Sequence, residues 1–298
     1  MTPMRHHMDA LAAFDNYDWT RPQTAPALTD EMAKAMQELA NPSSNFQATQ
    51  PNEILRLYKA GAYKMHMRRK PPAAQEDIAM AEALLGKAYA ALQADKELRM
   101  PMMANDDYYR IGNNLAFAMV NRDGANEETF RKADIILEGV ISGARHDVPV
   151  IAFAQRIKGQ IEFRRAETAH SFEGKRELVL SGVRKCLLGI HGLALPANLS
   201  EVARTHNNNA VNLLALVEHA PAYDTESKEL VLVHAKAEAE RAGKLWAQHD
   251  PQGQYKEFAQ RTDNTTAEIV QTAEQLGIEL GGFSTTHGRP SNPSTRKR

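Results

Sequence analysis

The amino-acid sequence predicts an all-α protein, and two observations lead to this prediction. Apolar residues recur at spacings of three and four within stretches rich in Ala, Leu, Glu, Lys and Met, as on one face of an α-helix. Stretches in which Val, Ile, Thr and aromatic residues alternate with polar ones between turns are nearly absent. We therefore expect helices packed on helices, with no sheet.

Residues that start and stop helices divide the chain into ten predicted helices. Pro51 suits the first turn of one helix, and Pro71 and Pro72 separate it from the next. Asp147 and Thr225 are expected to cap two later helices, because their side-chain oxygens can accept hydrogen bonds from backbone N–H groups. In chain order the predicted helices are 30–41, 52–69, 74–93, 105–122, 126–143, 148–167, 172–191, 199–218, 225–247 and 253–276.

Small residues recur at corresponding places when these helices are taken in pairs. In the first helix of each pair, Gly61, Gly112, Gly159 and Asn207 correspond, with spacings of 51, 47 and 48 residues. A second column of small or medium residues recurs in the second helix of each pair: Ala81, Leu85 and Ala88; Ala133, Leu137 and Val140; Gly182, Cys186 and Gly189; Ala235, Ala239 and Ala242. Such columns let the backbones of antiparallel helices approach each other closely.

The stretch "RIGNNLAFAM", residues 110–119, followed by "EETFRKADIILEGVI" resembles a tetratricopeptide repeat, with Gly112 at the small position of the first helix. The resemblance covers residues 52–247. It implies a right-handed α-solenoid of about four antiparallel helical hairpins, with the helix over 253–276 as a C-terminal cap. The units are longer than a standard repeat, and an irregular helical bundle in which alanine-rich helices match by chance is the alternative.

The chain divides into three predicted parts. Residues 1–29 are expected to form a mobile N-terminal arm or short helix, residues 30–276 the tetratricopeptide-like helical-repeat domain, and residues 277–298 a C-terminal tail. The N-terminal sequence has no continuous apolar stretch typical of a secretory signal, and no apolar run is long enough to cross a membrane. With a single cysteine and a formal net charge of -1, we expect a cytoplasmic protein that does not bind membranes.

Adjacent amides suggest a binding surface on the first helices of the pairs. Setting the units in register places Asn113, Gln160 and Asn208 in one column, with Asn114 and Asn209 beside it. In tetratricopeptide-like arrays the first helices line a concave groove, and an amide offers both a donor and an acceptor to an extended peptide. The alternative is that these amides hydrogen-bond to one another or to loop carbonyls inside the protein.

Four cations are candidates for the same groove: Lys64, Arg110, Lys158 and Arg204. They could hold an acidic motif or a terminal carboxylate of the partner. The leading prediction is therefore a noncatalytic interaction scaffold or adaptor that binds a protein or peptide partner in a concave helical groove. Solvated positions on helix faces are the alternative for each of the four.

A nucleic-acid-binding module is the second predicted function. It would use a local basic patch at the end of a helix and the basic chain end, namely Arg68, Arg69, Lys70, Arg296, Lys297 and Arg298. Cations at a helix C-terminus also complement the helix dipole, which is a structural reason for the first three.

A helical-bundle enzyme without a recognisable motif is the third alternative. No zinc-binding H-E-x-x-H helix, phosphate-binding loop or G-x-S-x-G nucleophile elbow is present, and the histidines are scattered. Cys186 lies in an apolar stretch, which predicts a packed, inert thiol. We therefore expect neither catalysis, nor a metal, nor a cofactor.

Overall fold

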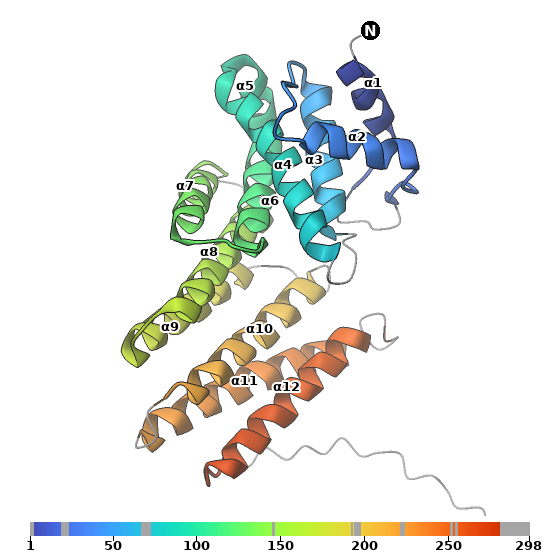
Figure 1. Cartoon of the computed structure of the whole chain (residues 1–298). Helices are drawn as coiled ribbons and strands as arrows, with labels where there is room; N and C mark the ends of the chain where they lie inside the picture. Colours follow the sequence, from blue (N-terminus) through green and yellow to red (C-terminus); the bar gives the residue numbers. More distant parts are fainter. Residues whose placement is uncertain are drawn as a thin grey trace, which may run out of the picture.

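The computed structural model describes residues 3–18, 24–66, 73–144, 147–191, 193, 198–220, 224–250, 253 and 256–280. Within these ranges all regular secondary structure is helical, which confirms the predicted all-α class (Figure 1). The elements are α1 (Pro3–Ala10), the 3-10 helix η1 (Leu11–Phe14), α2 (Asp30–Ala40), α3 (Pro51–His66), α4 (Ala73–Ala94), α5 (Lys96–Ala104), α6 (Asp107–Asn121), α7 (Glu127–Gly143), α8 (Val148–Thr168), α9 (Phe172–Ile190), α10 (Leu199–Glu218), α11 (Thr225–His249) and α12 (Lys256–Gln275).

The helix starts follow local capping chemistry. Asp147 caps α8 as predicted, because its Oδ1 accepts a hydrogen bond from the Val150 N–H at 3.1 Å. The predicted cap at Thr225 is wrong by one residue: Asp224 accepts from the Ser227 N–H at 3.1 Å, and Thr225 begins α11. A carboxylate at this place also interacts favourably with the partial positive charge at the N-terminus of the helix.

Helix α5 was not predicted. Asp95 caps it by accepting from the backbone N–H groups of Glu97 and Leu98. Pro101 lies inside the helix and lowers its intrinsic helix propensity, which is why the sequence pattern indicates a break there. Met102 is buried, so packing stabilises a segment that propensity disfavours.

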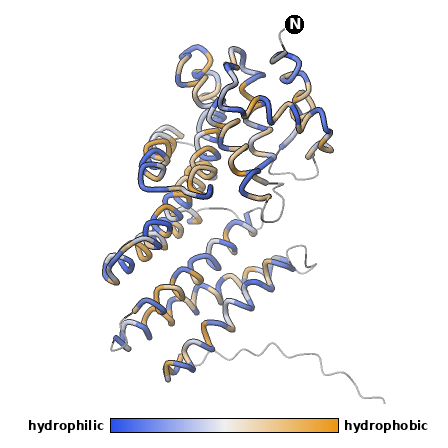
Figure 2. The backbone as a smooth tube through the Cα atoms, in the orientation of Figure 1, coloured by the Kyte–Doolittle hydropathy of each residue, from blue (hydrophilic) through white to orange (hydrophobic). Residues whose placement is uncertain are grey.

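Consecutive helices pack as pairs along the chain: α3 with α4, α6 with α7, α8 with α9, and α10 with α11. Each pair also contacts the next, because α4 packs on α6, α6 and α7 pack on α8, and α9 packs on α10. Helix α12 then packs on α11 and α10 (Figure 1). Figure 2 shows that hydrophobic and hydrophilic residues alternate around the helices, so each helix has an apolar side for its neighbours.

The predicted glycine column lies at the contacts within the pairs. A methyl group on Gly61 would lie 2.7 Å from Leu85, and one on Gly112 would lie 3.2 Å from Val140. Both partners belong to the second predicted column. The two sequence columns therefore face each other across these pairs, and the missing side chain of glycine sets the distance between the helices.

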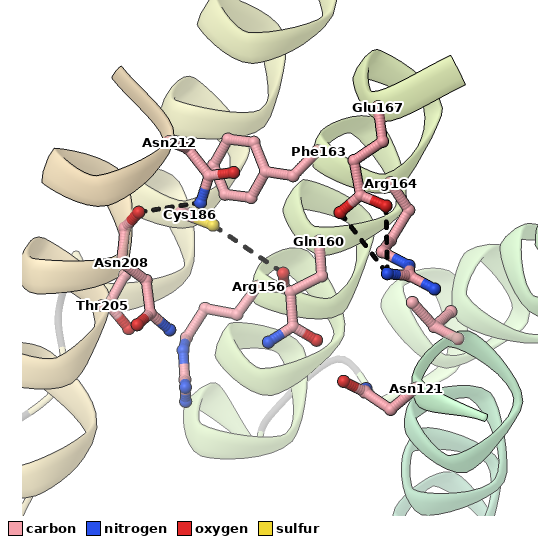
Figure 3. A pocket seen from close by; sticks show the side chains of 11 residues that line it. Asn121, Arg156, Gln160, Phe163, Arg164, Glu167, Cys186, Thr205, Asn208 and Asn212 are labelled. Carbon is pink, nitrogen blue, oxygen red and sulfur yellow. Dashed lines mark hydrogen bonds and ion pairs between the residues drawn. The ribbon is translucent and has the colours of Figure 1, made fainter. Parts of the chain in front are cut away.

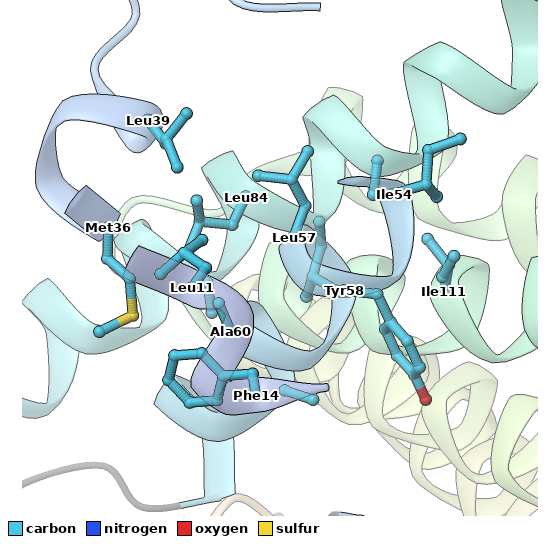
Figure 4. Close-up of a cluster of buried hydrophobic side chains, with 14 of the residues drawn as sticks. Leu11, Phe14, Met36, Leu39, Ile54, Leu57, Tyr58, Ala60, Leu84 and Ile111 are labelled. Atoms are coloured by element: carbon cyan, nitrogen blue, oxygen red, sulfur yellow. The ribbon is translucent and has the colours of Figure 1, made fainter. Parts of the chain in front are cut away.

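The first hydrophobic cluster corrects the expectation of a mobile arm over residues 1–29. Leu11 and Phe14 are completely buried, and Phe14 packs edge-on against Tyr63, with 5.2 Å between the ring centroids (Figure 4). Arg56 of α3 also holds Asp15 through two hydrogen bonds of 2.9 and 2.8 Å. Burying each such large side chain stabilises the fold by about 1.5–3 kcal/mol, so this part of the predicted arm is packed on the helices. The alternative of a short helix agrees with α1 and η1.

A second cluster, here called the C-terminal cluster, joins α8 to α12. It contains Phe163 and Cys186 together with buried residues of α10, α11 and α12, and Ile278 after α12 belongs to it. Ile278 lies in the predicted tail of residues 277–298, so the start of that tail is packed on the helices. None of the helices in the described part of the chain has the length and hydrophobicity of a membrane-spanning segment.

Candidate partner-binding pocket

A pocket of about 190 Å³ lies between α8 and α10, and the end of α6 and Cys186 of α9 complete its lining (Figure 3). Helix α8 packs on α6, α7 and α9, whereas α10 packs on α9, α11 and α12. Since α9 contacts both α8 and α10, it forms the floor between them. The pocket is therefore built from helices and not from a loop.

The floor exists because α8 and α9 approach each other at small residues. A methyl group on Gly159 would lie 2.8 Å from the Gly182 carbonyl oxygen, closer than real contacts allow. Cys186 lies beside them, and its thiol is 3.8 Å from the Arg156 carbonyl oxygen. Burial raises the pKa of this thiol to about 12, so Cys186 is a neutral, packed group, which confirms its predicted burial.

Two side-chain amides on the pocket wall are held in one orientation by hydrogen bonds to backbone carbonyls of their own helices. Asn121 donates from Nδ2 to the Phe117 carbonyl at 2.8 Å, and Asn212 donates from Nδ2 to the Asn208 carbonyl at 2.8 Å. A carbonyl oxygen only accepts hydrogen bonds, so the NH₂ group must face it. The Oδ1 atoms of Asn121 and Asn212 therefore point away from these carbonyls and are available as acceptors on the pocket wall.

Two members of the predicted amide column also line this pocket. Gln160 lies on α8, and its Oε1 is buried with no hydrogen-bond partner among the described residues. Asn208 lies on α10 and is exposed. A buried amide oxygen without a partner costs about 1–3 kcal/mol, so a donor that enters the pocket gains this interaction.

Two arginines add positive charge. The guanidinium of Arg156 forms an ion pair with Glu201 of α10, and only 13% of the Arg156 side chain is exposed. Arg164 lies two helical turns further along α8 and forms an ion pair of 3.0 Å with Glu167, one turn beyond. The pocket thus combines amide acceptors with cationic donors beside the apolar ring of Phe163, a combination that matches the alternating N–H and C=O groups of an extended peptide.

Three predicted groove residues are corrected by the structure. Asn113 and Asn114 are each 1% exposed, and Asn209 is completely buried. Asn113 donates to the Val150 carbonyl at 2.8 Å, Asn114 to the Arg110 carbonyl at 2.9 Å, and Asn209 to Glu238 at 3.0 Å. These amides hold helices together, as the alternative of internal hydrogen bonding predicted.

The four predicted groove cations contact other parts of the chain and do not line the pocket. Lys64 forms an ion pair of 3.0 Å with the buried Asp77, Arg110 pairs with Asp147 at 2.9 Å, and Lys158 pairs with Glu138. The Arg204 guanidinium lies 4.8 Å from the centre of the Phe258 ring. None of the four lines this pocket, so they are not part of the site described here. The predicted nucleic-acid patch, comprising Arg68, Arg69, Lys70, Arg296, Lys297 and Arg298, lies outside the described residues.

Sequence reasoning missed most residues of this pocket, among them Asn121, Arg156, Arg164 and Asn212. A signal was present for three of these four. Arg156 and Arg164 lie four residues before and after Gln160, and Asn212 lies four residues after Asn208, so each shares a helix face with a predicted residue. Asn121 ends α6 and has no predicted site residue four positions away from it.

No group of three or more His, Cys, Asp or Glu residues within the described ranges is arranged to hold a metal ion. No protein-family model, curated protein or solved structure matches this chain.

Proposed function

We propose that this chain is a noncatalytic interaction scaffold that holds an extended segment of a partner protein in the pocket between α8 and α10. The observation that carries the proposal is the buried Oε1 of Gln160, which has no hydrogen-bond partner in the described part of the chain and lies between the oriented amides of Asn121 and Asn212 (Figure 3). These acceptors are complementary to peptide N–H groups, and Arg156 and Asn208 supply donors for peptide carbonyls.

The size of the pocket supports a peptide segment over an enclosed small-molecule ligand. Its volume of about 190 Å³ is below the roughly 300–1,000 Å³ that is typical of sites for drug-sized ligands. Such a volume suits a few residues of a longer chain that continues along the surface.

A solenoid architecture is part of this proposal. Four helix pairs follow one another, and the first helix of each later pair packs on the pair before it. This succession supports a right-handed, tetratricopeptide-like array in which α6, α8 and α10 line the concave side and α12 is the cap. The single, buried cysteine is consistent with our expectation of a reducing, cytoplasmic location.

The test is capture of a partner from native cell extract, followed by binding of the identified partner to the purified chain. The pocket variant carries Gln160→Ala and Asn212→Ala. Its matched control carries Gln260→Ala and Asn264→Ala, which removes the same residue types from the exposed surface of α12. Circular dichroism and thermal melting establish that both variants are folded.

We expect the wild type and the control to bind the purified partner segment equally and the pocket variant to lose most of the affinity. Loss of two hydrogen-bonding amides corresponds to roughly 1–3 kcal/mol, or about 5- to 150-fold. Equal binding by the folded pocket variant contradicts the proposal, because the partner then binds elsewhere.

A further inference from the structure

We infer that the pocket recognises its segment through a carboxylate that binds Arg156, and that Glu201 is the internal competitor for this guanidinium. This inference rests on the proposed function, since it names the chemistry of the segment that the same pocket holds.

Arg156 is the better placed of the two pocket arginines to bind a carboxylate. Its side chain is 13% exposed, whereas that of Arg164 is 40% exposed. The Nε of Arg156 is buried and has no hydrogen-bond partner among the described residues. A guanidinium has five N–H donors in a fork that matches a carboxylate, so the ion pair with Glu201 leaves donor capacity unused.

Glu201 already demonstrates this recognition with a carboxylate from the chain itself. It lies in the first turn of α10, and its side chain is 42% exposed. The end of a helix with free N–H groups favours a negative charge, and the same potential acts on a carboxylate of a bound segment. Because 42% of the Glu201 side chain is exposed, a carboxylate from a segment can reach the same guanidinium and replace Glu201.

Arg164 does not provide the same selectivity. Its partner Glu167 is one turn away on the same helix, and 59% of the Glu167 side chain is exposed. Glu167 partly neutralises the positive charge of Arg164, and water near the surface screens the charge further. The charge that a segment meets in the less exposed part of the pocket is therefore that of Arg156.

The probes are fluorescein-labelled mixtures of ten-residue peptides with random sequence in which the central residue is fixed as Glu or Gln. Neutral residues fill the random positions, and each mixture is prepared with an amidated C-terminus and with a free one. Fluorescence anisotropy measures binding to the full chain at low and moderate salt. We expect the amidated Glu mixture to bind about tenfold more tightly than the amidated Gln mixture if a side-chain carboxylate is recognised. A similar gain on freeing the C-terminus of the Gln mixture identifies the terminal carboxylate as the source.

Two variants with opposite expected effects test the role of Arg156. Arg156→Lys keeps the charge but removes the fork, and it reduces the preference for a carboxylate about tenfold. Glu201→Gln removes the competitor and raises the affinity for the carboxylate mixtures roughly threefold. Glu128→Gln is the matched control, because it removes an exposed carboxylate that pairs with Arg131 on α7, outside the pocket. We expect it to leave binding unchanged.

The outcomes separate this inference from the proposed function. If Glu and Gln mixtures bind alike in both terminal forms, and Gln160→Ala with Asn212→Ala weakens all of them, the pocket binds peptides but the carboxylate inference is wrong. If Glu201→Gln leaves the affinity for carboxylate mixtures unchanged while Arg156→Lys lowers it, Glu201 is not a competitor and that part of the inference is overturned. If none of the mixtures binds, both the proposed function and this inference are wrong. The variant Glu201→Gln keeps the test decisive even if Arg156→Lys fails to fold.

Discussion

Gly159 of α8 and Cys186 of α9 face each other so closely that no methyl group fits between the Gly159 Cα and the Cys186 sulfur. This contact joins the two helices that form one wall and the floor of the pocket.

Gly159→Ala is expected to destabilise the protein by about 1–3 kcal/mol, because the added methyl group also meets the rigid Gly182 carbonyl. Gly243→Ala is the matched control. It lies in α11, where an added Cβ meets nothing within 4 Å, and it should stabilise by about 0.5–1 kcal/mol through helix propensity. Urea unfolding measures both values. Equal stability of the two variants would show that α8 and α9 are further apart than described.

Asn113→Ala and Asn208→Ala should have opposite consequences. Asn113→Ala removes a buried hydrogen bond to the Val150 carbonyl, so it lowers the free energy of unfolding by about 1–3 kcal/mol. Binding at the pocket stays unchanged as long as the variant is folded. Asn208→Ala alters an exposed pocket residue, so it weakens partner binding and changes stability by less than about 0.5 kcal/mol. Weaker binding by folded Asn113→Ala would contradict this assignment.

Stability should depend on pH through Glu238, a carboxylate buried between α10 and α11. Burial raises its pKa, but hydrogen bonds from His206 and Asn209 and the charge of Arg241 outweigh burial, so the pKa lies below its ordinary value of 4.5. A carboxyl group with a lowered folded pKa stabilises fully above its unfolded pKa. This contribution is lost as the pH falls through the folded pKa.

Glu238→Gln should therefore reduce stability by about 1–3 kcal/mol at neutral pH and flatten the fall in stability in acid. Urea unfolding between pH 3 and pH 7, spanning the ordinary value of 4.5, compares the variant with the wild type. Curves that stay parallel below that value would show that Glu238 does not contribute to the acid sensitivity.

Phe14→Ala is expected to lower the free energy of unfolding by about 3–5 kcal/mol, because the ring is completely buried against the first hydrophobic cluster. His6→Ala is the control, since 68% of the His6 side chain is exposed. It should change stability by less than about 0.5 kcal/mol. If both variants are as stable as the wild type, the N-terminal segment of α1 and η1 does not contribute to the stability of the fold.

Helix existence and pairing could be predicted from the sequence because they depend on local signals. Asp147 caps its helix wherever that helix lies in space. Gly61 and Gly112 allow a second helix to pack closely, whichever helix that is. The direction in which each helix face points depends on the assembled fold. Asn113 and Asn121 lie on the same helix but point in directions about 80° apart, because they are eight residues apart in sequence. Asn113 therefore forms an internal hydrogen bond, whereas Asn121 lines the pocket.

The ion-pair partners of the cations could not be predicted from the sequence pattern either. Lys64 and Asp77 are 13 residues apart, and Arg110 and Asp147 are 37 residues apart, so only the packing of the helices brings them together.

The packing of the N-terminal segment could not be predicted for a related reason. Leu11 and Phe14 are apolar and spaced as in a helix, but a short segment gains its stability from the surface that it covers.

The pocket shares two lining residues, Cys186 of the floor and Phe163 of the wall, with the C-terminal cluster. Unfolding of this cluster therefore abolishes the pocket, and a segment that binds only the folded chain must shift the equilibrium between the two states. At a free concentration of one hundred times the dissociation constant, such a segment adds about 2.7 kcal/mol to the apparent stability of α8–α12. Resistance to proteolysis in this half of the chain is then a direct measure of how much of the protein carries its partner.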